Sequence, residues 1–361
     1  MNRGILSNIN FSLLFPVLAL VGFSLTVIFS INSSLFWNQL IFFGISLFVF
    51  VLCSNINYQI IRLYAKPIYF GSIIVLLLLL FLGIESHGAV RWFEIFGFRV
   101  QFSEFMKPFM AISLAAYLSE NSSRSLKTFG TVLLLLFPIT LLIFLQPDLG
   151  NALIYLFVVV LSLLTFGFPF KFFISGIALM LISSPIAWRF LHDYQRQRIL
   201  TFLDPTSDPL GTSYNAIQSI IAVGSGMFLG QGLGQGTQSA LKFLPERHTD
   251  FIFATTSEEL GFVGVIVLLI FFGLLLYRIF MIFIDSDEMF SKIFILTCFY
   301  ILLIQFFINV GMNIGIVPIV GVTLPFVSYG GSSLLSSFIL LGLLSAVTGG
   351  EERTKHVLEI K

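Results

Sequence analysis

KFLPERHTDFIFATTSEELG, residues Lys242 to Gly261, is the segment where a long polar stretch meets an apolar run. It ends the polar interruption that begins at Leu191 in an otherwise very apolar chain. Hydrophobic residues make up 57% of the 361 residues and charged residues only 10%, whereas a soluble domain is nearer half apolar and a quarter charged. We therefore predict an all-α, polytopic membrane protein in which residues 191–250 form a large loop.

The composition also excludes several classes of protein. A net charge of +1 argues against a nucleic-acid partner. Cys53 and Cys298 both fall inside apolar runs, which disfavours a disulfide framework or a zinc site. No small-residue cleavage site follows the first apolar run, so that run is predicted to remain as the first membrane span.

Membrane spans can be placed from the length of the apolar runs, since a helix needs about 20 apolar residues to cross the bilayer. Ten runs of roughly that length form a single integral membrane domain over 1–361. The predicted spans are 11–31, 35–53, 67–84, 102–119, 129–146, 150–168, 171–190, 251–278, 292–313 and 328–348. An even number of spans places both termini on the same side.

The distribution of Lys and Arg predicts the orientation. With the N-terminus inside, eleven Lys and Arg residues lie on the inner side and seven on the outer side, and five of those seven lie in or beside 191–250. Long loops begin to escape the positive-inside rule, so the short loops count eleven against two. Both termini are therefore predicted to be cytoplasmic, in the cytoplasmic (inner) membrane, with the large loop between the seventh and eighth spans outside.

The loop itself contains two patterns. Apolar residues recur at helical spacing after position 213, with polar residues opposite, which predicts an amphipathic helix on the outer leaflet. The apolar set is Tyr214, Ile217, Ile220 and Ile221, and the polar set is Asn215, Gln218 and Ser219. Six glycines follow between Gly224 and Gly236; their spacing matches no phosphate-binding motif and favours a hinge or a close approach of the backbone.

Charged residues inside the predicted spans are expensive and indicate function by default. Glu104 and Lys107 are three residues apart and can pair on one helix face, either to lock the helix or to contact a substrate. Asp148 either caps the helix that begins before Asn151 or belongs to the site. For Glu258 and Glu259 we favour a structural role.

Two outer segments border the same region. Trp92 lies in the hairpin 85–101, where it is either an interfacial anchor or a wall of the site. The segment 314–333 contains two prolines and several glycines, and such broken backbone survives at membrane depth only against protein or a water-filled cavity. We predict a re-entrant segment there. Before it, Gln305, Asn309 and Asn313 are spaced four apart and share one helix face.

Asp250 is the strongest candidate for chemistry, because its carboxylate lies at the boundary between loop and span. A carboxylate placed there can serve as a general base. The nearby basic residues suit an anionic phosphate, and they are Arg196, Arg198, Lys242, Arg247 and His248. The alternative is that Thr249 or Asp250 only caps the eighth span. No metal site is legible, although a divalent cation (Mg²⁺ or Mn²⁺) bound with Asp250 is one way to stabilise a leaving pyrophosphate.

These motifs, in this order, resemble the SEDS family, whose members include RodA and FtsW. The matching segments are GAVRW, SEFMK, LQPDLG, QRQRILTFLDPTSDPLG, LPERHTDFIF with EELG behind it, and LPFVSYGGSS. The wording of FLDPTSDPLG and LPERHTDFIF is more similar to RodA, the elongation member. One departure is visible: the family usually has QPSE where this chain has Gln101, Phe102, Ser103 and Glu104, and the lost proline alters the entry into the fourth span.

The resemblance implies ten helices and a peptidoglycan glycosyltransferase that polymerises lipid II, releasing undecaprenyl pyrophosphate. It also implies a partner, a class B penicillin-binding protein that supplies the transpeptidase. By motif, Asp250 matches the essential aspartate of the family, and Trp92, Glu104, Lys107 and Asp148 match functionally sensitive positions. Three alternatives stay open from the residues: a lipid II transporter supported by the polar face at 305–313, a scaffold without chemistry, and an FtsW-like role in division.

Overall fold

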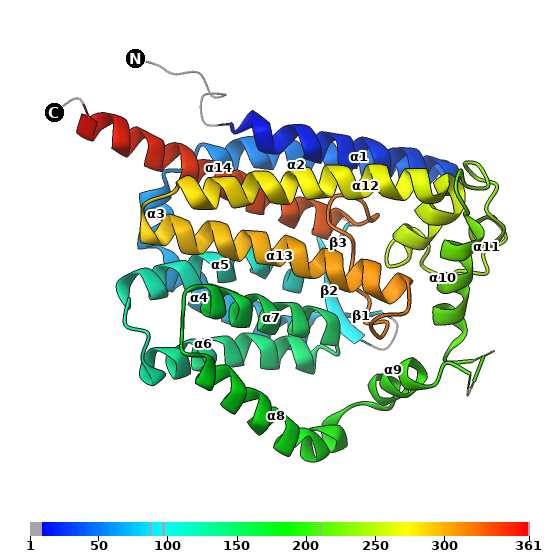
Figure 1. Cartoon of the computed structure of the whole chain (residues 1–361), viewed down its shortest axis with the longest axis horizontal. Coiled ribbons are helices and arrows are strands. Elements are labelled where there is room, and N and C mark those ends of the chain that lie inside the picture. Colours follow the sequence, from blue (N-terminus) through cyan, green and yellow to red (C-terminus); the bar gives the residue numbers. More distant parts are fainter. Residues whose placement is uncertain (1–8, 87–88, 96–97, 207, 210, 360–361) are drawn as a thin grey trace.

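The computed structural model describes residues 9–86, 89–95, 98–206, 208–209 and 211–359. Most of its long helices lie side by side along one axis (Figure 1). Each predicted span falls on one of them: α1 (Phe11–Ile31), α2 (Ser33–Ser54), α4 (Ala65–Leu82), α5 (Phe102–Glu120), α6 (Leu126–Leu145), α7 (Leu149–Thr165), α8 (Phe170–Phe190), α12 (Ile252–Asp285), α13 (Met289–Asn313) and α14 (Gly331–Glu359). The remaining helices are α3 (Tyr58–Leu63), α9 (Asp193–Leu203), α10 (Tyr214–Ser225) and α11 (Thr237–Ala240).

The helical membrane class is confirmed. Among the described residues, seven helices are long and apolar enough to cross a bilayer: α1, α2, α4, α6, α12, α13 and the Gly331–Gly350 part of α14. Two further apolar helices, Leu149–Thr165 and Phe170–Ile186, are shorter. Helix α5 carries the buried charges of Glu104 and Lys107. The count of ten spans therefore stays a prediction.

Helix α13 forms the centre of the bundle. It packs against α5, α7, α12 and α14, and large side chains such as Phe290, Phe294 and Leu302 are fully buried along it. Helix α8 is the opposite case: apart from Phe173, its large apolar side chains are mostly exposed, and it diverges from the bundle in Figure 1. Such a surface suits contact with lipid, which is as apolar as the side chains themselves.

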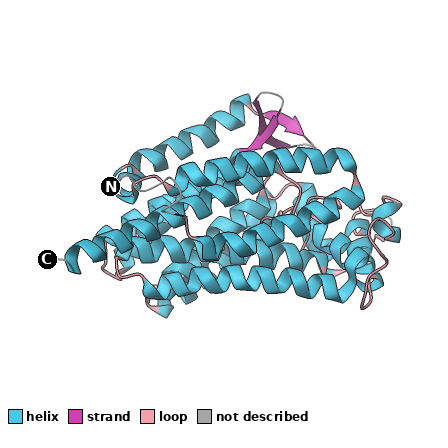
Figure 2. Cartoon of the chain, turned by 90° about the horizontal axis from the view of Figure 1, so that it is seen from above, coloured by secondary structure: helices cyan, strands magenta, loops and turns pink. Residues whose placement is uncertain are grey.

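A small sheet departs from the predicted all-α class. Strands β1 (Ile84–Ser86), β2 (Ala89–Ile95) and β3 (Phe98–Gln101) pair antiparallel in that order and lie away from the labelled termini (Figure 2). The sheet is attached to α14, because the Gln101 amide donates to Ser332 Oγ at 3.0 Å and Ser332 Oγ donates to the Arg99 carbonyl at 3.3 Å. The hairpin expected at 85–101 thus has regular strands.

The amphipathic helix predicted inside the loop exists as α10, which runs across the end of the bundle rather than along it (Figure 1). Ser219 and Ala222 are buried, and Ser219 Oγ donates to the Asn313 carbonyl at 3.0 Å. Ile220 and Ile221 are exposed on the other face. The helix is confirmed, and its contact with the outer leaflet stays a prediction.

Helix α12 is broken at Gly261, whose φ of 63° and ψ of −162° are not helical. The glycine-rich segment fills the break with its own backbone. Four hydrogen bonds join the two: Gln231 N–H to Glu258 O (2.9 Å), Gly232 N–H to Glu259 O (3.0 Å), Phe262 N–H to Met227 O (3.0 Å) and Val263 N–H to Phe228 O (3.2 Å). The loop therefore takes the place of the missing helical partners.

Side chains on the same turn strengthen this attachment. The Glu258 carboxylate accepts the amides of Gln238 at 2.7 Å and Ser239 at 2.9 Å, which are orphan donors in the first turn of α11. Glu259 accepts a hydrogen bond from Ser30 Oγ of α1 at 2.5 Å. The structural role favoured for these two carboxylates agrees with these contacts.

Glycine is required where the segment touches α12. A Cβ added at Gly226 would overlap the Ser257 carbonyl, and one added at Gly230 would overlap the Glu259 carbonyl. Backbone atoms on both sides leave no flexible side chain to move away. The expected close approach of the backbone is confirmed.

We predict that Gly226→Ala lowers the free energy of unfolding by about 1–3 kcal/mol, the usual cost of overpacking. Gly224→Ala is the matched control, because its added Cβ meets no atom within 4 Å and alanine favours the helix by roughly 0.5–1 kcal/mol. Thermal unfolding of the purified proteins in detergent measures both. Equal melting temperatures for the two variants would contradict the close contact.

Candidate active site

Asp250 lies at the end of the loop, immediately before Phe251, the N-cap of α12. The carbonyl oxygens of four consecutive residues all accept hydrogen bonds. The donors are Thr255 Oγ1 to Arg247 O (3.1 Å), the Tyr329 amide to His248 O (2.8 Å), Ser328 Oγ to Thr249 O (2.6 Å), and the side-chain amides of Asn309 and Asn313 to Asp250 O (3.0 Å each). The backbone that carries the Asp250 carboxylate is therefore fixed by α12, α13 and the segment before α14.

Asn313 also serves the beginning of α12. Its Oδ1 accepts the Ala254 amide at 3.1 Å, so α13 supplies a cap to a helix far away in sequence. Thr249 Oγ1 instead donates to the carbonyl and carboxylate of Glu246, at 3.2 and 3.1 Å. The first-turn amide of Ala254 is thus satisfied without Thr249, which weakens the interpretation of this motif as a simple helix cap.

Two of the three residues on the polar face predicted on α13, Asn309 and Asn313, therefore hold the Asp250 backbone in place. Asn309 joins Asp250 to the irregular segment, because its Nδ2 also donates to the Val322 carbonyl at 2.7 Å. Gln305 is buried as well, but its Nε2 has no hydrogen-bond partner among the described residues.

The segment between α13 and α14 is irregular, and from Val320 to Ser328 it is mostly buried, as the re-entrant prediction requires. Ser24 Oγ of α1 donates to the Val327 carbonyl at 2.5 Å, and Gln39 Nε2 of α2 donates to the Ser328 carbonyl at 3.3 Å. Its backbone polar groups are thus satisfied by protein, the condition for non-helical backbone at membrane depth.

Two glycine contacts place this segment between Asp250 and the start of α7. A Cβ added at Gly321, where φ is +73°, would lie 3.3 Å from Asp250 Oδ2. A Cβ added at Gly150 would lie 2.7 Å from the Val320 carbonyl oxygen. Residues 320–322 therefore separate the Asp250 carboxylate from the turn that holds Asp148.

Asp148 is the N-cap of α7, as one of its two interpretations predicted, and it also gathers other polar groups. Its Oδ1 accepts the Asn151 amide at 3.1 Å. Its Oδ2 accepts Gln101 Nε2 at 2.7 Å, Ser103 Oγ at 3.0 Å and Asn151 Nδ2 at 2.9 Å. The Asp148 side chain is 1% exposed, and these four hydrogen-bond donors take the place of water around its carboxylate.

The predicted pair of Glu104 and Lys107 is confirmed. Lys107 Nζ lies 2.7 Å from Glu104 Oε1, with the two side chains 2% and 7% exposed. Removing one partner of a buried pair leaves an uncompensated charge, typically at a cost of about 3–5 kcal/mol. This supports the helix-locking interpretation, and direct contact with a substrate stays a prediction.

Trp92 lies on β2 beside this cluster. Its Cα partner in the β2–β3 ladder is Gln101, whose side chain reaches Asp148. Directly opposite residues in an antiparallel pair share one face of the sheet, so the half-buried Trp92 lies on the Asp148 side. The sheet thereby brings Trp92 near the Asp148 cluster, and its role as a wall of the site stays a prediction.

The basic residues do not gather into one clamp. Arg196 donates to the Trp188 and Arg189 carbonyls at 3.1 and 3.0 Å, so it serves the end of α8. Arg198 lies 5.5 Å from the Tyr194 ring, whose hydroxyl donates to the Pro147 carbonyl at 2.8 Å. Helix α9 therefore docks on the turn before Asp148.

Arg247, His248 and Lys242, the three basic residues nearer Asp250 in sequence, differ in how free their side chains are to bind a substrate. Arg247 Nη1 donates to the Ser239 carbonyl, and burial lowers the pKa of its guanidinium against the opposing charge of Glu259. Burial also lowers the pKa of His248, with Glu246 opposing and Arg247 reinforcing the change, which favours the neutral imidazole. Lys242 is exposed and, among the described residues, has no side-chain hydrogen bond or ion pair.

Lys242 and Glu246 have positive φ values of 62° and 51°. Non-glycine residues adopt this conformation rarely, and it concentrates at functional sites. The backbone of residues 242–250 therefore includes two residues in an energetically unfavourable conformation.

Over the described part of the chain, no three His, Cys, Asp or Glu side chains are grouped to hold a metal ion. The residues around Asp250 do not themselves form a cage for the divalent cation considered from the sequence. No chemical step below is routed through one.

The family model for FtsW, RodA and SpoVE, described as cell cycle protein, matches residues 5–353. The chain belongs to this family. Among curated relatives, the peptidoglycan glycosyltransferase MrdB of Escherichia coli K12 is 39% identical over 347 residues, covering 93% of this chain and 92% of the relative. Stage V sporulation protein E of Bacillus subtilis is 34% identical, covering 86% of each.

Solved structures of the FtsW, RodA and SpoVE family agree with the fold. The rod shape determining protein RodA of Thermus thermophilus superposes with a TM-score of 0.73 at 28% identity, covering 95% of this chain and 97% of that one. A chain from a peptidoglycan synthase complex, solved in work on the coordination of polymerization and crosslinking, has a TM-score of 0.83 at 32% identity over 94% and 97% of the chains. The resemblance found in the motifs is confirmed.

Several residues of the site were not singled out from the sequence. Asn309 and Asn313 were noticed for their spacing, but nothing in that spacing indicated that they hold Asp250. Gln101 and Ser103 were quoted only within a motif, and Ser328 and Tyr329 only within a broken segment. Gln101 and Ser103 lie next to Glu104 in the chain, which was an available signal, whereas the other four lie far from Asp250 in sequence.

We predict that Asn313→Ala slows glycan polymerisation at least tenfold, because misplacing a catalytic group by about 1 Å can cost roughly 10²-fold. Gln305→Leu is the matched control on the same helix face. It removes a buried donor without a partner, so the melting temperature should hold or rise. Polymer formed from labelled lipid II, measured together with thermal unfolding, tests both variants. A strong loss of activity in Gln305→Leu alone would indicate that the polar face acts on the substrate instead.

Proposed function

We propose that this protein is a RodA-like peptidoglycan glycosyltransferase that polymerises lipid II at the outer face of the cytoplasmic membrane during elongation. The observation that carries the proposal is the anchoring of Asp250: four consecutive carbonyls around it are hydrogen-bonded to three separate elements. A catalytic group needs such fixed placement. Family membership supplies the substrate class.

The reaction is an inverting glycosyl transfer. The 4-hydroxyl of the acceptor GlcNAc attacks the anomeric carbon of a lipid-linked sugar. The new C–O bond forms as the bond from that carbon to the pyrophosphate oxygen breaks, and undecaprenyl pyrophosphate leaves with the bonding pair. Asp250 takes the acceptor proton, a step that general-base catalysis typically accelerates by about 10²–10⁴-fold.

The leaving pyrophosphate needs positive charge nearby. Lys242 is the best placed of the predicted cations, because its side chain is exposed and unengaged and it lies in the same segment as Asp250. Arg247 and Arg196 hold backbone carbonyls, which leaves them fewer free donors. For Arg198 and His248 we propose contacts with other parts of the substrate.

Two other functions are less well supported. A lipid II transporter drew its support from the polar face of α13, yet Asn309 and Asn313 on that face are engaged in holding Asp250. An FtsW-like role in division uses the same chemistry. The 39% identity to MrdB exceeds the 34% to FtsW of Trichlorobacter lovleyi, which favours elongation.

A class B penicillin-binding protein is the partner we propose. The similarity to a chain of a peptidoglycan synthase complex that couples polymerization and crosslinking supports it, since a second subunit must supply the crosslinking. Activity of the purified protein should accordingly rise when such a partner is co-expressed.

We predict that Asp250→Asn abolishes glycan polymerisation while the protein folds normally. The amide is nearly isosteric but cannot accept the proton, so a loss of about 10²–10⁴-fold is expected. Asp250→Glu should also be badly impaired, since it moves the carboxylate by about one methylene. Polymer formed by purified protein from labelled lipid II is the measurement.

The control is Asp208→Asn, which removes an exposed loop carboxylate that serves only its own turn, through Thr212. Its polymer yield should match that of the unsubstituted protein. Near-normal polymer from Asp250→Asn would remove Asp250 from the mechanism, whereas normal lipid II translocation with unchanged polymer would favour the transporter.

We also predict that the large loop is extracytoplasmic. Thr206 in the loop and Ser122 between α5 and α6 are both exposed. Each is replaced by a single cysteine in a background lacking Cys53 and Cys298. An impermeant thiol reagent applied to intact cells should label Thr206→Cys only. Labelling of Ser122→Cys alone would invert the topology.

A further inference from the structure

A cavity of about 620 Å³ lies between α4, α5, α6 and α7, with the end of α3 beside it. This volume is within the roughly 300–1,000 Å³ of ligand pockets. Lys66 and Glu120 lie at this end of the bundle, where α4 begins and α5 ends. Glu104 and Glu120 are 16 residues apart on α5, roughly 24 Å at 1.5 Å per residue, so the rim of the cavity at Glu120 is remote from the buried pair of Glu104 and Lys107.

The walls of this cavity are mainly aliphatic and aromatic. Met110 and Leu114 of α5 and Val132, Leu136 and Ile139 of α6 lie along it. Such a lining suits a hydrocarbon chain, because the chain is as apolar as the side chains around it and packs against them by van der Waals contact.

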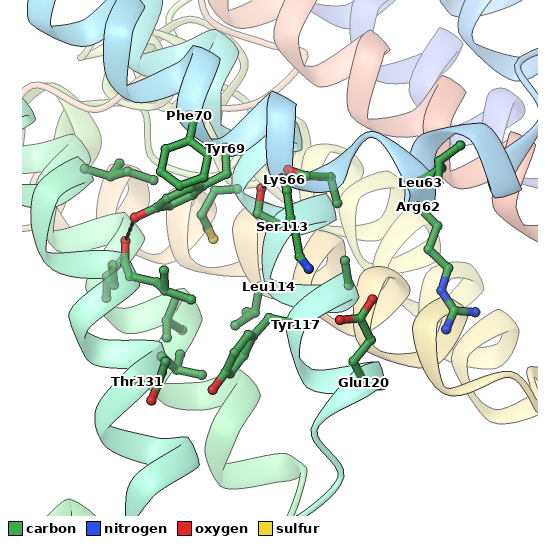
Figure 3. Close-up of a pocket in the computed structure, with 18 of the residues that line it drawn as sticks. Arg62, Leu63, Lys66, Tyr69, Phe70, Ser113, Leu114, Tyr117, Glu120 and Thr131 are labelled. Atoms are coloured by element: carbon green, nitrogen blue, oxygen red, sulfur yellow. Dashed lines mark hydrogen bonds between the residues drawn. The ribbon is translucent and has the colours of Figure 1, made fainter.

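The rim carries one cation and one carboxylate that are not committed elsewhere. Lys66 and Glu120 are both exposed, and neither has a salt-bridge partner among the described residues. Figure 3 shows the Lys66 ammonium and the Glu120 carboxylate directed toward the same opening, with the Tyr117 hydroxyl below them. Arg62 also borders the cavity but is paired with Glu288 at 2.9 Å.

We propose that this cavity binds phosphatidylethanolamine from the leaflet on the side of the chain termini. An acyl chain occupies the apolar walls, Lys66 contacts the lipid phosphate, and Glu120 contacts the lipid ammonium. The pairing of a free cation and a free carboxylate on one rim complements a headgroup that carries both charges. A lipid whose headgroup carries only a phosphate leaves the Glu120 carboxylate without a positively charged partner and places the negative phosphate near that carboxylate.

The binding test uses the purified full-length protein in detergent, titrated with dioleoyl phosphatidylethanolamine or dioleoyl phosphatidylglycerol, with bound lipid counted by native mass spectrometry. Phosphatidylglycerol has the phosphate but no ammonium. Phosphatidylethanolamine should bind at least about tenfold more tightly, because only its headgroup offers Glu120 an ammonium. Glu120→Gln should remove this preference, and Lys66→Gln should weaken both lipids about tenfold.

Two further variants complete the design. Thr131→Phe fills the cavity from α6, where Thr131 lines it, and should block both lipids. Lys171→Gln removes an exposed lysine at the same end of the bundle but outside the cavity, and should change neither affinity. Thermal unfolding checks that each variant is folded; if Thr131→Phe is not, the exposed Lys66 and Glu120 variants decide the matter.

Equal affinities for the two lipids would overturn the proposal, as would an unchanged preference in Glu120→Gln. Loss of binding in Lys171→Gln to the same extent as in Lys66→Gln would do so too, because it would indicate general attraction to anionic groups. Since lipid binding is measured without glycan synthesis, the result is independent of the proposed enzymatic function.

Discussion

The break of α12 at Gly261 is the constraint on which the end of the molecule that carries Asp250 depends. A helix interrupted near the membrane leaves backbone donors and acceptors that water cannot reach freely, and each must find a protein partner. The glycine-rich segment supplies these partners through its own amides and carbonyls. Beside it, the Glu258 carboxylate holds the start of α11 and the Glu259 carboxylate holds Ser30 of α1. The large loop is thereby held as part of the bundle.

The same requirement organises the site around Asp250. Non-helical backbone before α12 meets non-helical backbone before α14, and each satisfies the other with help from α13. Residues 320–322 touch both Asp250 and the start of α7, so the Asp148 cluster and Asp250 flank one short segment. The non-helical backbone before α12 and before α14, which is costly in a bilayer, is concentrated around the Asp250 carboxylate.

Much of this could be predicted from the sequence because apolar length and local spacing encode it. The positions of the long helices, the pairing of Glu104 with Lys107 and the cap formed by Asp148 all depend on residues close together in the chain. The cap that Asn313 provides to α12, the attachment of β3 to Ser332 and the use of Arg196 at the end of α8 depend on tertiary packing. The basic residues were expected to act together, but hydrogen bonds to nearby carbonyls hold two of them apart.

The exchange of backbone hydrogen bonds across the break has a consequence for comparing members of the family by recombination. Chimeric proteins that transplant the loop alone would separate Met227 and Phe228 from the amides of 262 and 263 that they cap. Segment boundaries should therefore fall outside 226–263, so that donor and acceptor arrive from the same parent. At this end of the protein, the loop and the first turns of α12 should be exchanged together as one segment, and neither should be exchanged alone.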